Sequence, residues 1–359
     1  GKDAGTAVTI GVQNTFIGSL AGDAVSEGNH NVAVGLNSLG ANVLGSKSTA
    51  VGTGALATQN PATAINMYNV AVGYDAGVSV TTGQSNTLIG SLAGDALTTP
   101  ASNTAVGQNA LGADTQGSNT TAIGAGALQS QNFTTATESY NTAVGTYAGA
   151  SVTTGQYNTL IGRASGDAIT VGNSNTAVGQ NALGADTKGD LNTAIGIGAL
   201  QSQNFTTTTD SYNIAVGGFA GGNLTTGTLN TLIGGLAGNN LTGNGFSGST
   251  RTAGADRNVA IGHASLTSDT KGNNSVAIGR EALTTQNFTT ATDAYNVAVG
   301  VNAGQVNVTG IKNTLIGGLA GDSITGAGFS GSTRTAGGDS NVLLGYAAGQ
   351  NITTGDSNI

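Results

Sequence analysis

Short segments of alternating polar and aliphatic residues recur along the whole chain and predict a repeated β-strand. The pentad Asn-Thr-Ala-Val-Gly or a close variant occurs eighteen times, and its glycines are mostly 17 or 21 residues apart, with two steps of 28. The fourth pentad position is always Val, Ile or Leu, the second is mostly Thr or Val, and the third is mostly Ala. Such β-favouring residues, ended by Gly, predict a short strand.

The fixed period predicts stacked coils instead of one closed core. We therefore expect an all-β fold, a parallel β-solenoid (β-roll) of about eighteen coils with 17-, 21- and 28-residue repeats. Coils advance by about 4.8 Å each, so the array would form a rod. We expect a single continuous array over residues 1–359. It starts and ends within a repeat, which indicates a segment of a longer fibre or the protomer of a filament.

Each pentad position has an expected role in the coil. The first position, Asn, is expected to form an amide ladder between coils, and the last, Gly, suits a turn with positive φ or a close backbone approach. Period 2 places the second and fourth side chains on one face, interpreted as the core, and the third on the outer face. Once in about 72 residues the third position is a large apolar group, which predicts a chain–chain contact stripe. Its members are Phe16, Leu88, Leu160, Leu232 and Leu315.

The composition argues against several kinds of partner and site. The net charge of −8 argues against binding a nucleic-acid backbone, which needs clustered Lys and Arg. Cysteine is absent, which removes disulfides and thiolate sites together. The sequence has no apolar run of 18 residues, so we expect no membrane insertion.

The repeat resembles a known class of surface proteins. Asn-Thr-Ala-Val-Gly at residues 103–107 and Ser-Val-Ala-Ile-Gly at residues 275–279 are each followed by a small residue three places on. They resemble the head repeats of trimeric autotransporter adhesins and the related arrays of phage tail fibres. The resemblance implies a left-handed β-roll, a homotrimer, an extracellular location on a cell surface or virion, and a role in adhesion or host recognition. The repeats of those heads are shorter than the ones in this chain.

Little in the sequence breaks the repeat in the way that an active site would. His30 and His263 lie in different coils without carboxylate partners and are expected in surface loops. Asp114 and Asp186 belong to Gly-Ala-Asp-Thr-x-Gly segments, which favour Asx-turns over a calcium site. We therefore expect no catalysis, no cofactor and no metal.

Two kinds of loop are candidates for partner contact, since insertions on a scaffold often carry binding. The first kind places a Phe in a four-residue insertion and a Tyr before the next pentad, where rings can stack on sugar. The alternative is that each Phe–Tyr pair only stabilises its own loop. These residues are Phe133, Tyr140, Phe205, Tyr212, Phe288 and Tyr295. The second kind is the larger insertion that contains Phe246 and Arg251, with its copy at Phe329 and Arg334.

The expected function is that of a structural and adhesive fibre segment that presents edge loops to a cell-surface glycan. The alternative is an extracellular filament subunit that stacks head-to-tail through its terminal coils. Ice binding by paired threonines, such as Thr81 and Thr82, and glycan hydrolysis are further alternatives.

Overall fold

The computed structural model confirms an all-β, parallel β-solenoid. It describes residues 1–243, 254–326 and 337–359, and the backbone alone of the pairs 246–247, 250–251, 329–330 and 333–334. No helix occurs among these residues. The chain forms two compact units, residues 1–173 and 174–359, which we describe separately. The single continuous array, the handedness and the homotrimer stay predictions.

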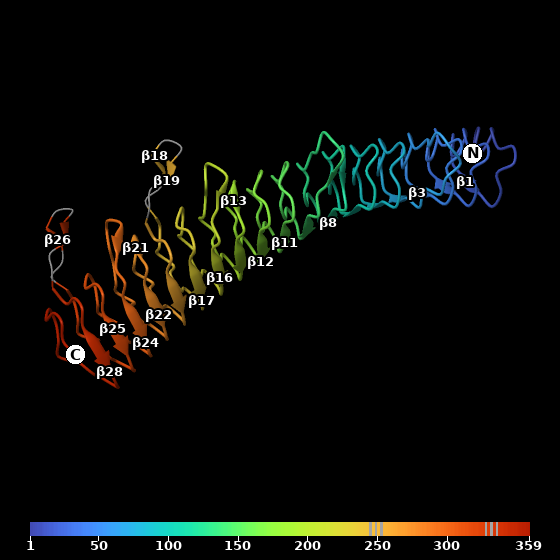
Figure 1. Ribbon diagram of the computed structural model, residues 1–359. Coiled ribbons are helices and arrows are strands. Elements are labelled where there is room, and N and C mark those ends of the chain that lie inside the picture. Colours follow the sequence, from blue (N-terminus) through green and yellow to red (C-terminus); the bar gives the residue numbers. More distant parts are fainter. Residues whose placement is uncertain (244–245, 248–249, 252–253, 327–328, 331–332, 335–336) are drawn as a thin grey trace. The chain divides into compact units, whose positions relative to one another are not determined.

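Unit 1 is a stack of coils, each of which contributes one three-residue strand to a parallel sheet (Figure 1). The strands pair in chain order, and each pentad position lies beside the same position of the next coil, as Leu88 does beside Ala105. The sheet strands are β1 (Thr15–Ile17), β2 (Val32–Val34), β3 (Thr49–Val51), β4 (Val70–Val72), β5 (Thr87–Ile89), β6 (Thr104–Val106), β8 (Thr121–Ile123), β10 (Thr142–Val144) and β11 (Thr159–Ile161).

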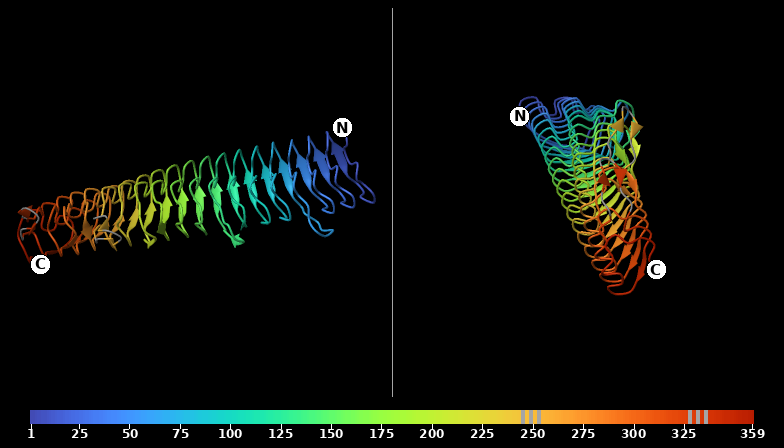
Figure 2. Two further views of the ribbon diagram at one scale, coloured as in Figure 1. Left: turned by 90° about the horizontal axis from the view of Figure 1, so that it is seen from above. Right: turned by 90° about the vertical axis from the view of Figure 1, so that its left-hand side faces the viewer.

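Unit 2 repeats this architecture with the same in-register parallel pairing. Figure 2 shows the strands of each unit aligned along one face. The sheet strands are β12 (Thr176–Val178), β14 (Thr193–Ile195), β16 (Ile214–Val216), β17 (Thr231–Ile233), β20 (Val259–Ile261), β22 (Val276–Ile278), β24 (Val297–Val299), β25 (Thr314–Ile316) and β28 (Val342–Leu344).

The longer repeats add two-residue strands outside the main sheets. Three parallel pairs accompany the 21-residue repeats: β7 (Gly117–Ser118) with β9 (Thr137–Glu138), β13 (Gly189–Asp190) with β15 (Thr209–Asp210), and β21 (Gly272–Asn273) with β23 (Thr292–Asp293). Two antiparallel pairs occur in the 28-residue repeats: β18 (Phe246–Ser247) with β19 (Thr250–Arg251), and β26 (Phe329–Ser330) with β27 (Thr333–Arg334).

The prediction of which strand face is inside was wrong. The third pentad residue points into the coil: Ala105 and Leu88 are fully buried, whereas the second and fourth residues of the same strands are partly exposed. The small residue three places after the pentad glycine, such as Ala110, is also buried in every coil before the last. The third pentad position and this second small residue form two columns of small side chains inside the coil. Because the coil is thin, its interior has no room for a Val or an Ile in every repeat.

The pentad glycine allows the coils to stack closely. Gly107 has a φ of 135°, and a Cβ at this residue would lie 2.6 Å from the carbonyl oxygen of Gly124 in the next coil. Only glycine combines this backbone conformation with such a close approach. The expected role of the repeated glycine is therefore confirmed.

The asparagines in the first pentad position form the predicted ladder between coils. Its hydrogen bonds join the Asn side chains to backbone groups as well as to other side chains. Asn86 Oδ1 accepts the backbone N–H of Asn103 at 3.0 Å, and Asn86 Nδ2 donates to the carbonyl of Pro100 at 3.0 Å. The backbone N–H of Asn86 donates in turn to Oδ1 of Asn69 at 2.9 Å. Each buried amide thus joins one coil to the next and satisfies backbone groups that the three-residue strands leave unpaired.

Candidate functional site

The chain–chain contact stripe was predicted on the outer face of the coils, and this prediction is wrong. Its residues point into the coils. Leu88, Leu160, Leu232 and Leu315 are fully buried. Phe16, which is half-buried, also points into the coil, because a Cβ on Gly22 would lie 2.5 Å from its ring. These large side chains occupy space that glycine leaves open on the opposite side of the coil.

Leu88 shows how this packing works. A Cβ on Gly94 would lie 2.8 Å from a methyl carbon of Leu88, and one on Gly77 would lie 2.6 Å from the other. Most coils with Ala in the third position carry a buried Leu at the place of Gly94, as in the pair Ala105 and Leu111. The coil that precedes each Leu-containing coil instead has Gly there, such as Gly77 before Leu88. A large Leu in the third position is therefore accommodated where the facing residues are glycines, which keeps the total side-chain volume of the narrow core nearly constant.

The outward face of the strands is a regular surface feature of both units. Its second and fourth pentad positions hold only Thr, Val, Ile or Leu, and none is charged. Ile89, Ile123 and Ile161 are 37–38% exposed in unit 1, as are Ile195 and Ile233 at 37–38% in unit 2. In-register pairing places these side chains one above another in continuous columns. Each unit thus presents a flat aliphatic and hydroxyl-bearing strip.

The loop phenylalanines are core residues, so their assignment as contact rings is wrong. Phe133 is 5% exposed, and Phe205 and Phe288 are fully buried. The backbone N–H of Phe133 donates to Oδ1 of Asp114 at 3.1 Å. Each Phe therefore holds its own insertion against the coil, as the alternative interpretation proposed for the Phe–Tyr pair, but the tyrosines are exposed.

Buried aspartates form the centre of these insertions. Asp114 Oδ1 accepts the Gly117 N–H at 2.9 Å, which confirms the Asx-type turn, and its Oδ2 accepts Gln131 Nε2 at 2.6 Å. Burial raises the pKa of the Asp114 carboxyl, although these hydrogen bonds oppose the rise. Asp186 with Gln203 and Asp269 with Gln286 repeat the arrangement in unit 2, and burial raises the pKa of both carboxyls.

The loop tyrosines are exposed, as contact residues require. Tyr140, Tyr212 and Tyr295 are 46%, 49% and 53% exposed and have φ values of 49°, 49° and 50°. In every coil the residue before the first pentad position adopts this left-handed conformation. These residues form a column that projects to solvent along the sheet edge. Sequence reasoning identified the three tyrosines but missed their neighbours in the column, above all Tyr157.

Other candidates have clear positions or lie outside the described residues. His30 and His263 are exposed, one in each unit, as expected. The side chains of Phe246, Arg251, Phe329 and Arg334 lie outside the part of the chain that the structure describes. Within the described part, His, Cys, Asp and Glu side chains form no group of three that could hold a metal ion. No helix there has the length and apolar character needed to cross a lipid bilayer.

In two of the threonine pairs, one hydroxyl bonds between coils and the other threonine, Thr82 or Thr154, is exposed. Thr81 Oγ1 donates to the Thr98 carbonyl at 3.2 Å, and Thr153 Oγ1 donates to the Thr170 carbonyl at 3.0 Å. Thr226 is only 4% exposed. The ice-binding alternative therefore stays a prediction.

Comparison with known proteins adds no family to these observations. No protein-family model, no curated protein and no solved structure matches the chain. Arguments about function therefore rest on the two surfaces described above, the outward sheet face and the exposed edge column.

Proposed function

We propose that this chain is a segment of a non-catalytic structural and adhesive fibre on the surface of a bacterium or virion. In this proposal three copies associate, and the edge loops attach the fibre to a cell-surface glycan. The resemblance of the pentads to adhesin-head and tail-fibre repeats motivates the proposal. One structural observation carries it: the uncharged aliphatic face that every coil of the two sheets repeats.

An exposed apolar strip of this regularity favours a contact between chains. Single exposed aliphatic residues are ordinary on protein surfaces, but contiguous apolar patches are rare on monomers and mark interaction sites. In unit 1 the strip includes Ile89, Val106 and Ile123, which lie in register on neighbouring strands. Because like residues lie above like, the same strip on a second and third copy can pack against it along its length.

The sequence predicted a chain–chain contact through a stripe of leucines, but these leucines are buried. The proposed interface takes the place of that stripe. It involves the fourth pentad position where the sequence interpretation used the third. Threonine hydroxyls at the second position lie beside the aliphatic column and can form hydrogen bonds across such an interface.

Attachment to intact cells tests the adhesive role. Purified fibre is mixed with candidate host cells or with their extracted surface polysaccharide, and the amount of protein that sediments with them is measured. We expect retention of the protein and no shortening of the polysaccharide. A protein that stays in the supernatant with every surface tested, or a polysaccharide that becomes shorter, would contradict the proposal.

A further inference from the structure

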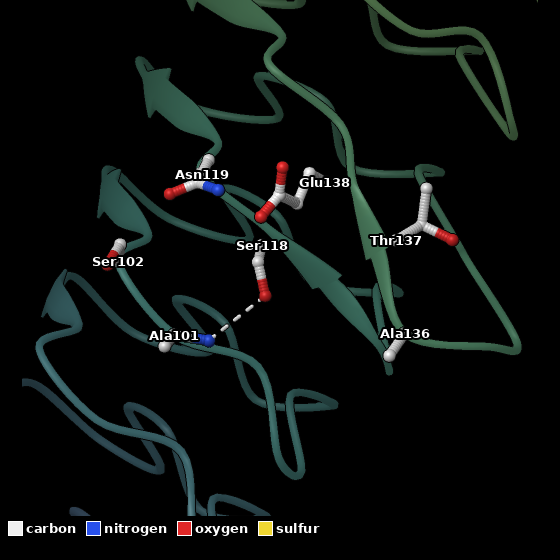
Figure 3. A pocket seen from close by; sticks show the side chains of 7 residues that line it. All are labelled: Ala101, Ser102, Ser118, Asn119, Ala136, Thr137 and Glu138. Carbon is white, nitrogen blue, oxygen red and sulfur yellow. Dashed lines mark hydrogen bonds between the residues drawn. The ribbon is translucent and has the colours of Figure 1, made fainter.

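A polar groove opens at the edge of unit 1, where a 21-residue repeat adds strands β7 and β9. It has a volume of about 460 Å³, within the range of small-molecule sites. Residues from three successive coils line it: Ala101, Ser102, Ser118, Asn119, Ala136, Thr137 and Glu138 (Figure 3). Two of them, Ser102 and Asn119, belong to the left-handed edge column.

The groove is rich in neutral hydrogen-bonding groups and has one acid. Hydroxyl and amide groups come from Ser102, Asn119 and Thr137, and Glu138 is exposed. The Ser118 hydroxyl accepts the Ala101 N–H at 3.2 Å, which joins two of the coils that line the groove. None of the lining residues is basic, so the groove offers no ion pair to a phosphate, a sulfate or a carboxylate.

An exposed pair of aromatic rings adjoins this groove through Glu138. The Tyr140 hydroxyl donates to the Glu138 carboxylate. The rings of Tyr140 and Tyr157 stack with centroids 5.6 Å apart and planes inclined by 19°. Tyr157 is 56% exposed, so ring surface is available to a ligand. An apolar ring face beside a row of hydroxyl, amide and carboxylate groups matches a sugar, which has apolar C–H faces and hydroxyl edges.

We propose that this groove, with Tyr140 and Tyr157, is a binding site for a neutral oligosaccharide. The inference rests on the proposed adhesive function and places its recognition site at one edge of unit 1. The rings stack on a sugar face, while Asn119, Thr137 and Glu138 exchange hydrogen bonds with its hydroxyls. The Glu138 carboxylate repels acidic sugars, so charge contributes to specificity.

One of the two corresponding places in unit 2, the one at Tyr295, supplies a matched control. Tyr295 has the same backbone conformation as Tyr140, but Lys312 stands where Tyr157 would be. Asp293, the counterpart of Glu138, accepts hydrogen bonds from Asn273 and Asn274 at 3.2 and 2.9 Å. That site therefore lacks the ring pair, and its carboxylate is hydrogen-bonded to asparagine side chains instead of a tyrosine hydroxyl.

Saturation-transfer NMR tests the site with defined probes: maltohexaose, cellohexaose, chitohexaose and the acidic hexagalacturonate. We expect the wild-type protein to bind at least one of the three neutral probes, and to bind hexagalacturonate more weakly. Tyr140→Ala and Tyr157→Ala should each weaken binding of that neutral probe by about tenfold. Tyr295→Ala should bind like wild type, and Glu138→Gln should reduce the discrimination against hexagalacturonate. Circular dichroism of each variant checks that the fold is kept.

Two results would overturn the inference: no neutral probe binds the wild-type protein, or the Tyr140→Ala and Tyr157→Ala variants bind as wild type does. Cell attachment, measured in parallel, separates this failure from failure of the proposed function. Wild-type attachment that is unchanged in both tyrosine variants leaves the adhesive fibre intact and removes this groove as its site. A wild-type protein that attaches to no surface contradicts the adhesive function itself.

Discussion

At the scale of single residues, two neighbours on one strand have opposite environments. Leu88 is fully buried against glycines of its own and the preceding coil, whereas Ile89 projects from the outward sheet face and is 37% exposed. Hydrophobicity does not distinguish them, because both are large and aliphatic. The face of the strand to which each side chain points decides whether it stabilises the coil or is exposed for the proposed contact between chains.

Replacement of Leu88 by Ala is expected to destabilise the fold by about 2–5 kcal/mol, because the narrow core cannot collapse around the missing side chain. The matched change Ile89→Ala is expected to cost less free energy of unfolding in the isolated chain. Urea denaturation of both variants, under conditions where the chain is dissociated, provides the comparison. Equal losses, or a larger loss for Ile89→Ala, would show that the assignment of the two faces is wrong.

The buried aspartates give stability a pH dependence. Burial raises the folded-state pKa of Asp114, Asp186 and Asp269 above the unfolded value of about 3.9. A raised pKa means that the stabilising contribution is fully present below the unfolded pKa and is lost as the pH rises through the folded pKa. These three carboxyls therefore favour the folded state more at acidic than at neutral pH.

Asp114→Asn is expected to reduce this loss of stability between pH 4 and pH 8. The amide oxygen keeps an acceptor for the Gly117 N–H but carries no buried charge. Thermal unfolding across this pH range measures the slope, and Glu138→Gln, which removes an exposed carboxylate, serves as the control. A variant with the same slope as the wild-type protein would contradict the role assigned to Asp114.

At the scale of the coil, the sequence predicted the strand, the turn glycine and the asparagine ladder. These features could be predicted because each one is a single residue type at a fixed place, with a backbone reason for it. Gly107 and Asn86 are examples. The inward face could not be chosen in the same way, since both faces of Thr-Ala-Val are compatible with burial. Hydrophobicity favours Val for the core, but the thin coil admits Ala.

The sequence predicted only part of the candidate oligosaccharide site, because it does not show which way each side chain points. The Phe–Tyr spacing identified the insertion, but the local sequence does not show that Phe133 packs inward while Tyr140 projects outward. Asn119 and Glu138 meet at the groove because residues from successive coils lie side by side. That arrangement depends on the register of stacking, which one repeat alone does not reveal.

Asn86→Ala is expected to destabilise the stack by about 2–4 kcal/mol. The change removes the donor to Pro100 and the acceptor of the Asn103 N–H, and it leaves those buried backbone groups unpaired. Chemical denaturation measures the loss, with the exposed neighbour Ser85→Ala as the control. If both variants unfold at the same denaturant concentration, the ladder contributes no net stability.

At the scale of the whole molecule, the proposed fibre depends on the outward sheet face. Every coil carries the same uncharged pair of outward positions, so association would gain apolar burial on each one. The buried polar layers formed by Asp114 and Gln131, and by their counterparts in unit 2, do not contribute to this face. Assembly and folding therefore use different residues and can be perturbed separately.

A charge on the outward face is expected to dissociate the assembly and leave the coils folded. Ile123→Asp places a carboxylate within the strip in unit 1, where burial between chains would leave it unpaired. Size-exclusion chromatography with light scattering should give a lower mass than for the wild type, with an unchanged circular dichroism spectrum. Tyr295→Ala, away from the strip, should keep the wild-type mass. An Ile123→Asp protein of unchanged mass would exclude this strip as the interface.

The mass of the wild-type protein in solution tests the central claim most directly. Sedimentation equilibrium over a range of protein concentrations is expected to give one species with three times the mass of a single chain. Open-ended polymers that grow with concentration would contradict the closed trimer and favour a filament subunit that stacks head-to-tail. A monomer at every concentration would contradict both, because the aliphatic face would then have no partner chain.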